Sequence, residues 1–415
     1  MTHMTPTHSD ELEVAASASW TQSHGRSEAG LVADARTLAP LIRRHAPEAE
    51  QNRRLSPEVI VALRETGFFR MLLPRSLGGL EVDPVTCSLV IEEIARADSA
   101  AAWALQAGNT GAWWAARLPK EGVEEIYAAE PSTLQAAAFH PPQQAVEVPG
   151  GYRITGRGPL ASTIHDAEWL FLSAIVMDGD QPRLMDGRPV TIALVIRARE
   201  ARIIDTWRSL GMRGTDSNDV AFEDVFVPSS RTFPLMPAFE PNPYYSGPLY
   251  RFPGMATVIL VIAPVALAVA RGAVEEFREL AGRKAAFGFT VPLRERTPVQ
   301  ATVARAEGML RAARLLLYDT LAGVWSIVLT GESATLEQRA DLVLAGTHAA
   351  STAATVVGMM HQLAGTTGIY ERSPLERHFR DANTLRQHGF MSENRFETVG
   401  QVYLGVTPEF PLIAF

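Results

Sequence analysis

Few residues in this sequence form a pattern that performs chemistry by itself. The sequence holds no GxGxxG, GxxxxGK(S/T), GxSxG or HExxH motif, which excludes the common signatures of dinucleotide, phosphate, serine-nucleophile and zinc sites. Adjacent acids such as Glu92 and Glu93 diverge on a helix, and we expect them on solvated faces. His165 and Asp166 resemble a metal-binding pair, but no third ligand lies nearby in the sequence, and we expect no metal site. The residues alone reveal no catalytic constellation.

The composition bounds the class of protein. The chain has 415 residues, of which 47% are hydrophobic and 20% charged, with a formal net charge of −8. These values are ordinary for a soluble globular protein, and the acidic balance argues against a nucleic-acid partner. Cys87 is the only cysteine in the sequence, so no internal disulfide can form, as suits a reducing compartment. We therefore expect a cytoplasmic protein.

The first part of the chain combines a polar tail with helical patterns. Residues 1–27 lack the basic and apolar regions of a signal peptide, and we expect a disordered tail. Residues 28–130 carry apolar side chains at helical spacing, and Ser56 and Asp83, each followed by proline, mark helix starts. This pattern predicts an N-terminal helical domain.

Residues 131–240 change to the pattern of strands. Runs such as 169–176 and 220–227 are rich in β-branched and aromatic residues and are separated by Gly, Asp and Pro, which predicts a small barrel or sandwich. Residues 241–415 return to long helices rich in Ala, typical of an antiparallel bundle.

The longest apolar run covers residues 255–270. It is interrupted by Pro264 and is too short to cross a hydrocarbon core of roughly 30 Å comfortably. We expect a buried helix there and no membrane partner.

Four groups of motifs stand in an order that resembles one known family, the acyl-CoA dehydrogenase superfamily. They read LGGL at 77–80 with IEEIA at 91–95, GMRGTDS at 211–217 with FEDVFVP at 222–228, QLAGTTG at 362–368, and ER at 376–377 with RDA at 380–382. The likeness covers nearly the whole chain beyond residue 30. It implies an α+β fold with an N-terminal helical domain (28–130), a central β-barrel (131–240) and a C-terminal four-helix bundle (241–415), with a flavin held between them.

One position separates two branches of this superfamily. Where many dehydrogenases carry a catalytic glutamate after the RDA motif, this sequence has Gly389, preceded by His388, and a glycine cannot act as a base. Since some dehydrogenases place the glutamate on another helix, an FAD-dependent acyl-CoA dehydrogenase or oxidase remains the alternative. A non-catalytic, oligomeric binding protein is a third interpretation.

His388, the stretch 160–163 and the MRGTxS spacing resemble the flavin-dependent monooxygenases of this fold, such as the hydroxyphenylacetate, dibenzothiophene and steroid-phenol hydroxylases. The resemblance implies that reduced flavin, FMNH2 or FADH2, comes from a separate reductase and reacts with O2. The resulting C4a-hydroperoxyflavin would hydroxylate an aromatic or heteroaromatic small molecule.

The resemblance also suggests two catalytic residues. Ser162 matches the serine that donates a hydrogen bond near the flavin, although it could instead be a turn serine that caps Asp166. His388 would be the base for a substrate hydroxyl or ring N–H, because the ordinary pKa of histidine is about 6.5. The alternative for His388 is a surface residue near a helix end.

Weaker expectations concern the rest of the site. The resemblance places a further set of residues at the flavin: Phe139, His140, Ala161, Thr163, Trp207, Arg296, Gln300, Gly365 and Thr366. The alternatives are a surface loop position for His140 and core packing for Trp207. Lys284 and Arg294 are further candidates for its phosphate. Asn109 and Trp113 lie on the helix that would line the substrate pocket, with core packing as the alternative.

The long helices also predict assembly. The helix at 336–363 carries more apolar surface than one bundle can bury. Together with the resemblance, this predicts a homotetramer in which Gly365 and Thr366 serve the flavin of a neighbouring subunit.

Overall fold

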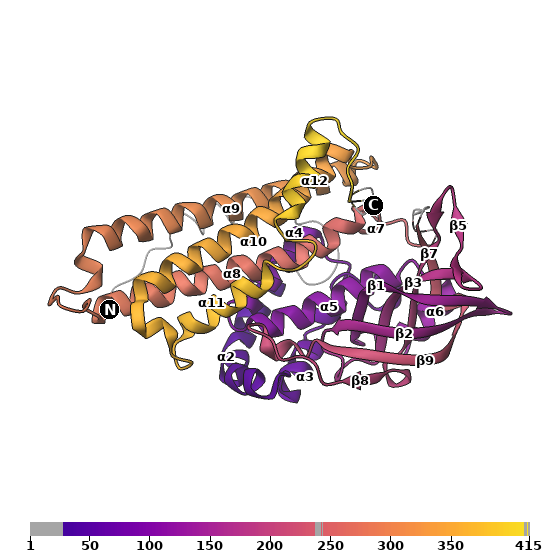
Figure 1. Ribbon diagram of the computed structural model, residues 1–415, viewed down its shortest axis with the longest axis horizontal. Coiled ribbons are helices and arrows are strands. Elements are labelled where there is room, and N and C mark those ends of the chain that lie inside the picture. Colours follow the sequence, from indigo (N-terminus) through magenta and orange to yellow (C-terminus); the bar gives the residue numbers. More distant parts are fainter. Residues whose placement is uncertain (1–27, 237–241, 243, 411–412, 414–415) are drawn as a thin grey trace.

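The computed structural model describes residues 28–236, 242, 244–410 and 413. The expected tail, residues 1–27, lies outside the described residues. Helices, a sheet and a helical bundle follow one another along the chain, and Figure 1 shows the bundle and the sheet at opposite ends of the molecule.

The N-terminal helices begin where their capping residues predict. Ser56 caps α3 (Pro57–Glu65), Asp83 caps α4 (Pro84–Ala95) and Asp98 caps α5 (Ser99–Ala115), each accepting a hydrogen bond from a backbone N–H of the first turn. The other two helices are α2 (Glu28–Asn52) and α6 (Lys120–Tyr127). Nearly all of α5 is buried, so this helix forms the inner wall of the N-terminal part.

The central part is one eight-stranded sheet. Its hydrogen-bonded order is β10-β7-β3-β1-β2-β9-β8, with β4 paired to β3. The strands are β1 (Gln135–Val148), β2 (Gly151–Ala161), β3 (Trp169–Asp178), β4 (Gln181–Pro182), β7 (Thr191–Arg197), β8 (Arg202–Ile204), β9 (Asn218–Pro228) and β10 (Thr232–Met236). A separate hairpin joins β5 (Leu184–Met185) to β6 (Arg188–Pro189). Within the described residues, the predicted barrel is thus a sheet whose path ends at β10 and β8.

Two features of the sheet position the site. Strands β1 and β3 are parallel, and their register shifts between Ala138 and Gln143. Strands β2 and β9 are antiparallel, and their last pair is Ala161 with Asn218. The loops beyond this pair therefore begin side by side.

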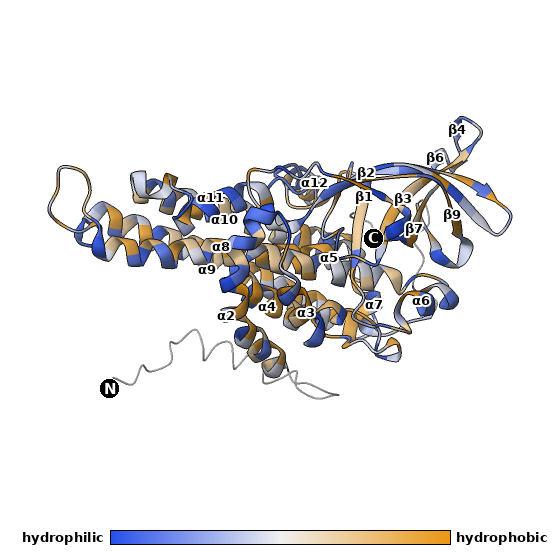
Figure 2. Cartoon of the chain, turned by 90° about the horizontal axis from the view of Figure 1, so that it is seen from below, coloured by the Kyte–Doolittle hydropathy of each residue, from blue (hydrophilic) through white to orange (hydrophobic). Residues whose placement is uncertain are grey.

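The C-terminal part contains the predicted long helices. They are α7 (Pro248–Arg251), α8 (Gly254–Arg283), α9 (Thr297–Leu329), α10 (Leu336–Ala364), α11 (Pro374–Leu385) and α12 (Asn394–Tyr403). Among the described residues, three helices, α8, α9 and α10, are long and apolar enough to cross a membrane by length and composition alone. The apolar window of α8 is 89% buried inside the protein, and Figure 2 shows this hydrophobic helix enclosed by its neighbours. The run at 255–270 is therefore the core of the bundle, as the sequence predicts.

Candidate active site

The β2–β9 ladder brings two serines together. Ser162 follows the last residue of β2 and Ser217 precedes the first residue of β9, and their Oγ atoms lie 2.8 Å apart. Ser217 is buried, whereas Ser162 is partly exposed. The pair therefore has one member inside the protein and one that a ligand can reach.

Four residues around this serine pair have left-handed backbone conformations. Leu160, Thr163, Met212 and Asp216 have φ values of 61°, 59°, 55° and 51°. This region is unfavourable for residues other than glycine, and such strain clusters at functional sites. Hydrogen bonds between the two loops hold the conformation, including Thr163 N–H to the carbonyl oxygen of Thr215 at 2.8 Å.

A chain of hydroxyl groups runs through the site. Trp103 Nε1 on α5 donates to Ser162 Oγ at 3.0 Å, and Ser162 bonds Ser217. Ser217 Oγ lies 2.7 Å from Thr215 Oγ1, which donates to the carbonyl oxygen of Met212 at 2.9 Å. We call Ser162, Ser217 and Thr215 the hydroxyl chain. Ser162 is thus bonded to Trp103 and Ser217, and the alternative that it caps Asp166 is not what the structure shows.

His388 also contacts Trp103. The two ring centroids are 5.5 Å apart at an interplanar angle of 71°, and Phe390 packs against the imidazole at the same centroid distance. Trp103 therefore contacts both predicted catalytic residues, which are far apart in the sequence.

The electrostatics of His388 differ from the expectation of a base poised near neutral pH. Burial among these rings disfavours the charged imidazolium and lowers the pKa of His388 to about 4. Its Nδ1 accepts a hydrogen bond from the Phe390 backbone N–H at 3.4 Å, so the single proton of the neutral ring is on Nε2. In this tautomer His388 has an N–H available to donate, and removal of a substrate proton would require the other tautomer.

The predicted flavin contacts around β1 and β2 differ in accessibility. Phe139 stacks on Phe171 with centroids 6.0 Å apart, inside a cluster completed by Trp114 and Phe233. His140 is exposed, while the Ala161 and Thr163 side chains are buried. Of these residues, His140 is thus the one that is open to solvent, whereas Ala161 and Thr163 are part of the packed strand end.

Three other predicted residues have structural contacts. Asn109 is fully buried, and its amide bonds the backbone of Phe68, Leu72 and Leu105. Trp113 is buried and donates to the carbonyl oxygen of Leu249 at 2.9 Å. These contacts match the alternative of core packing and leave both side chains without an exposed polar group for a substrate.

Trp207 supports the loop that carries the hydroxyl chain. Its Nε1 donates to the carbonyl oxygens of Met212 and Arg213, each at 3.1 Å. Trp207 thus holds the backbone on which Thr215 and Ser217 are mounted.

The remaining predicted cofactor residues form a second group, at the end of the bundle away from the sheet (Figure 1). Gly365 and Thr366 lie exposed in the turn after α10, where Lys284 Nζ bonds the Ala364 carbonyl oxygen and Thr367 Oγ1. Arg296 and Gln300 lie at the start of α9, which follows the same end of α8. Within one chain, these residues therefore lie at a different place from Ser162 and His388.

Acids and arginines connect α11 to the loop of the hydroxyl chain. Asp381 Oδ1 accepts from the Met212 backbone N–H at 2.6 Å, and Asp381 Oδ2 accepts from Ser99 Oγ at 2.8 Å. A Cβ atom at Gly211 would lie 2.3 Å from the Arg380 carbonyl carbon and oxygen, so this close approach requires glycine. These contacts give a physical reason for the RDA and GMRG motifs.

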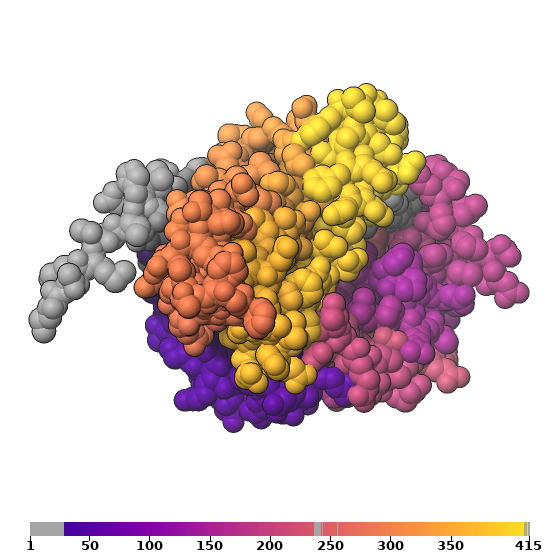
Figure 3. Space-filling model, turned by 60° about the vertical axis from the view of Figure 1, so that its left-hand side comes forward, coloured from indigo at the N-terminus to yellow at the C-terminus, as the bar shows by residue number. Residues whose placement is uncertain are grey.

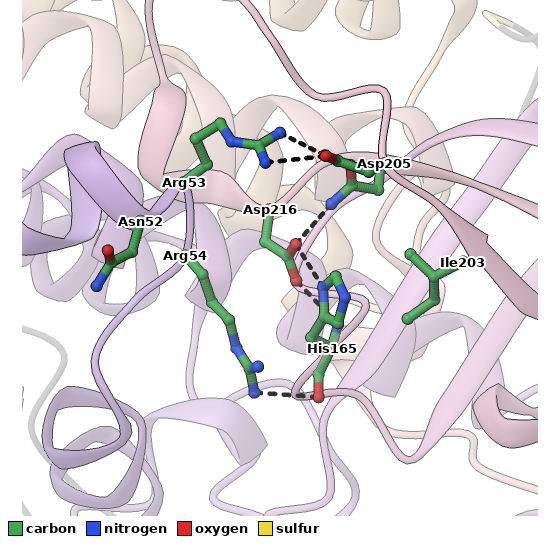
Figure 4. Close-up of a pocket in the computed structure, with 8 residues that line it drawn as sticks. Asn52, Arg53, Arg54, His165, Ile203, Asp205 and Asp216 are labelled. Carbon is green, nitrogen blue, oxygen red and sulfur yellow. Dashed lines mark hydrogen bonds and ion pairs between the residues drawn. The ribbon is translucent and has the colours of Figure 1, made fainter.

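A pocket of ≈320 Å³ lies beside the same loops, between the N-terminal helices and the sheet (Figure 4). Asp216 there accepts from His165 N, His165 Nδ1 and Asn218 Nδ2, each at 2.8 Å. Burial raises the pKa of the Asp216 carboxyl above its ordinary value, and the bonds to His165 oppose that rise. His165 pairs with Asp216 rather than with Asp166, which binds Arg54. Asp216, which lies between Thr215 and Ser217, is thus bonded to the turn that follows Ser162.

Comparison with known proteins identifies the family. The family described as "Acyl-CoA dehydrogenase, N-terminal domain" matches residues 32–127, and "Acyl-CoA dehydrogenase, C-terminal domain" matches residues 260–393. The indole-3-acetate monooxygenase of Pseudomonas putida is 35% identical over 361 residues, which are 87% of this chain and 90% of that relative. The chain belongs to the acyl-CoA dehydrogenase family.

Other relatives define the branch. The flavin-dependent monooxygenase oxygenase subunit HsaA of Rhodococcus jostii is 29% identical, across 85% of this chain and 92% of its own length. The structure of XiaF from Streptomyces sp. in complex with FADH2 and glycerol superposes with a TM-score of 0.86 at 25% identity, covering 92% of this chain and 97% of XiaF. The predicted fold class is confirmed, and so is the predicted activity: a flavin-dependent monooxygenase that uses reduced flavin and O2.

The described residues at Ser162 suit such a cofactor. A planar, hydrogen-bonding ring system needs apolar walls and a few polar groups, and here Ser162 Oγ and His388 lie beside the partly exposed rings of Trp103 and Phe390.

Sequence reasoning missed the connecting residues of this site. Trp103, Thr215 and Ser217 received no predicted role. The position of Ser217 in the MRGTxS spacing was a usable signal, because it stands directly before a predicted strand. No signal in the sequence indicated that Trp103 lies between Ser162 and His388.

Proposed function

We propose that this enzyme hydroxylates an aromatic or heteroaromatic small molecule bound beside Trp103, His388 and Phe390. The observation that carries the proposal is the contact of Trp103 with both Ser162 and His388. Ser162 would face the flavin and His388 the substrate. The relatives named indole-3-acetate monooxygenase, at 35% and 32% identity, support an indole-type ring as the first substrate to test.

Each residue has a specific task in this proposal. Bound reduced flavin supplies the electrons that activate O2. Ser162 holds the ring through its hydroxyl group, and α5 with its buried small residues excludes water behind it. His388, kept neutral by its surroundings, donates from Nε2 to an oxygen or π face of the substrate and so orients it.

The direct test supplies reduced FMN or FAD, ¹⁸O2 and indole-3-acetate under single-turnover conditions, followed by mass spectrometry. We expect one ¹⁸O atom in the product. Absence of labelled product with every indole and phenol offered, combined with oxidation of an acyl-CoA thioester by the oxidised enzyme, would favour the dehydrogenase or oxidase alternative.

We also propose that the protein is a cytoplasmic homotetramer supplied by a separate flavin reductase. Relatives named oxygenase subunit or oxygenase component support a second component. The α9 helix, part of the outer face in Figure 3, supports assembly because only 28% of its most apolar window is buried and Leu315 is 68% exposed.

In such an assembly, the group of Lys284, Arg296, Gln300, Gly365 and Thr366 would bind the phosphate side of a neighbouring subunit's flavin. Light scattering should give four times the 45.2 kDa monomer mass. A monomer mass at micromolar concentration would contradict both the assembly and the shared site.

A further inference from the structure

The groups at its two ends allow one direction for the protons of the hydroxyl chain. An indole N–H only donates and a carbonyl oxygen only accepts, while each hydroxyl group has one proton to donate. Since Thr215 donates to the carbonyl of Met212, Ser217 must donate to Thr215, and Ser162 must donate to Ser217. All protons then point from Trp103 toward Met212.

In this direction the proton of Ser162 is directed into the protein. Ser162 Oγ accepts from Trp103 and donates to Ser217, so only a lone pair remains for a ligand. Ser217 and Thr215 are 4% and 1% exposed. The chain therefore has one end, Ser162, that can meet a ligand, and that end is an acceptor.

The other end of the chain can release its proton at little cost. The carbonyl oxygen of Met212 also accepts from the Thr215 backbone N–H at 3.2 Å and from Trp207 Nε1 at 3.1 Å. If the Thr215 hydroxyl turns toward Ser217, this carbonyl keeps two donors, so no buried polar group loses its partner.

The reversed direction is equally complete. Thr215 then donates to Ser217, Ser217 donates to Ser162, and Ser162 donates outward while still accepting from Trp103. Hydrogen bonds in such a series polarise one another, which strengthens Ser162 as a donor. The same four side chains therefore present either an acceptor or a donor to a ligand.

A flavin ring makes the corresponding change. Its N5 atom is an acceptor in the oxidised ring and carries a hydrogen in the reduced ring. We infer that Thr215 and Ser217 are positioning residues that reverse the direction of the hydroxyl chain with the oxidation state of the bound flavin. This inference rests on the proposed placement of the flavin at Ser162. The chain directed inward accepts from the reduced ring, and the chain directed outward donates to the oxidised ring.

The test measures binding of both oxidation states rather than turnover. Dissociation constants of oxidised FMN and FAD are measured by fluorescence, those of the reduced forms by anaerobic titration, and the midpoint potential of the bound flavin by equilibration with dyes. Thr215→Val leaves Ser162 as the only acceptor for Ser217, and Ser217→Ala removes the inner acceptor of Ser162. Both changes fix the Ser162 proton in the outward direction.

We expect both variants to bind oxidised flavin nearly as the wild type does and reduced flavin about tenfold more weakly, the effect of one lost hydrogen bond. A tenfold change lowers the midpoint potential by ~30 mV for a two-electron couple. Thr215→Ser keeps the hydroxyl group and should restore the wild-type values.

Equal weakening of both oxidation states in Thr215→Val and Ser217→Ala, with no change in potential, would overturn the reversal, because a merely structural role affects both alike. Ser162→Ala distinguishes an incorrect flavin site from an incorrect reversal. If that variant binds both forms as the wild type does, the proposed flavin site itself is wrong, and the reversal falls with it. If it weakens binding while the two inner variants leave the potential unchanged, only the reversal is overturned.

Discussion

The indole N–H of Trp103 donates to the hydroxyl of Ser162 at 3.0 Å across an interface between the N-terminal helices and the sheet. Helix α5 and the end of strand β2 provide the two partners. The bond therefore joins the N-terminal helices directly to the sheet. The same indole also contacts His388 of the C-terminal part.

Replacing Trp103 by phenylalanine should separate these two contacts. Trp103→Phe keeps an aromatic ring against His388 but removes the donor to Ser162, so substrate affinity should change little. The coupling of O2 consumption to product formation should fall, with roughly three- to tenfold more H2O2 released per product molecule. This is the effect expected for loss of about 1 kcal/mol of hydrogen bonding. H2O2 and product are quantified in the same reaction.

Trp113→Phe is the matched control, because Trp113 bonds the carbonyl oxygen of Leu249 in the core. It should lower the melting temperature without uncoupling. Uncoupling of the same size in both variants would contradict a specific role for Trp103.

The pH dependence of turnover tests His388. With a pKa of about 4, its ring is neutral from pH 6 to 9, and kcat/KM should show no ionisation of this residue in that range. For His388→Ala we expect the coupling of O2 consumption to product formation to fall about 10-fold or more. His388→Gln, which keeps an N–H donor, should retain more of this coupling. An inflection near pH 6.5 that disappears in His388→Ala would restore the original hypothesis of a base poised near neutrality.

Two depressed histidine pKa values predict acid sensitivity of the fold. Burial lowers the pKa values of His378 and His388 to about 4 from the ordinary 6.5. Between these values the unfolded chain binds more protons than the folded one. The free energy of unfolding is therefore highest, with respect to these histidines, above pH 6.5, and it decreases as the pH falls toward 4. The decrease from pH 7 to 5 should be roughly 1–2 kcal/mol per histidine.

Urea denaturation at several pH values measures this decrease. His378→Gln should remove about half of the contribution that the two histidines make to this decrease. A slope that is identical in wild type and His378→Gln would show that His378 does not titrate in this window.

Asp381 should matter for stability more than an ordinary surface acid does. Its two carboxylate oxygens accept from Met212 N and Ser99 Oγ, and an amide can serve only one of these donors well. Asp381→Asn should therefore lower the free energy of unfolding by about 2–4 kcal/mol and weaken flavin binding. Asp219→Asn, which breaks the more exposed ion pair with Arg157, should cost less than about 1 kcal/mol. Equal costs for the two changes, measured by urea denaturation, would argue against the role of Asp381 as an anchor of the loop.

The sequence predicted those features of the molecule that depend on neighbouring residues. The starts of α3 and α4 follow from Ser56 and Asp83, and the buried course of α8 follows from its apolar run. The position of Ser162 at a strand end also follows from local pattern. In contrast, the contact of Trp103 with Ser162 depends on how three separate parts pack, and no local periodicity encodes that packing.

The low pKa of His388 was missed for the same reason. Its ordinary value is a property of the residue type, whereas the depression comes from Trp103 and Phe390 around it. The place of Asn109 on α5 predicts a pocket residue. Its amide instead satisfies backbone groups of the segment at 68–72, a distant requirement that composition does not express.

Helix α11 supports both the loop at 211–217 and the segment that carries His388, so the two cannot be moved independently. Asp381 on this helix fixes the backbone before the hydroxyl chain, and His388 follows three residues after its last turn. Any substitution that tilts α11 to admit a larger substrate will also displace the loop at 211–217. Variants designed to widen the range of substrates should therefore be tested for flavin affinity and stability as well as for activity, because the loop and the substrate side share this one support.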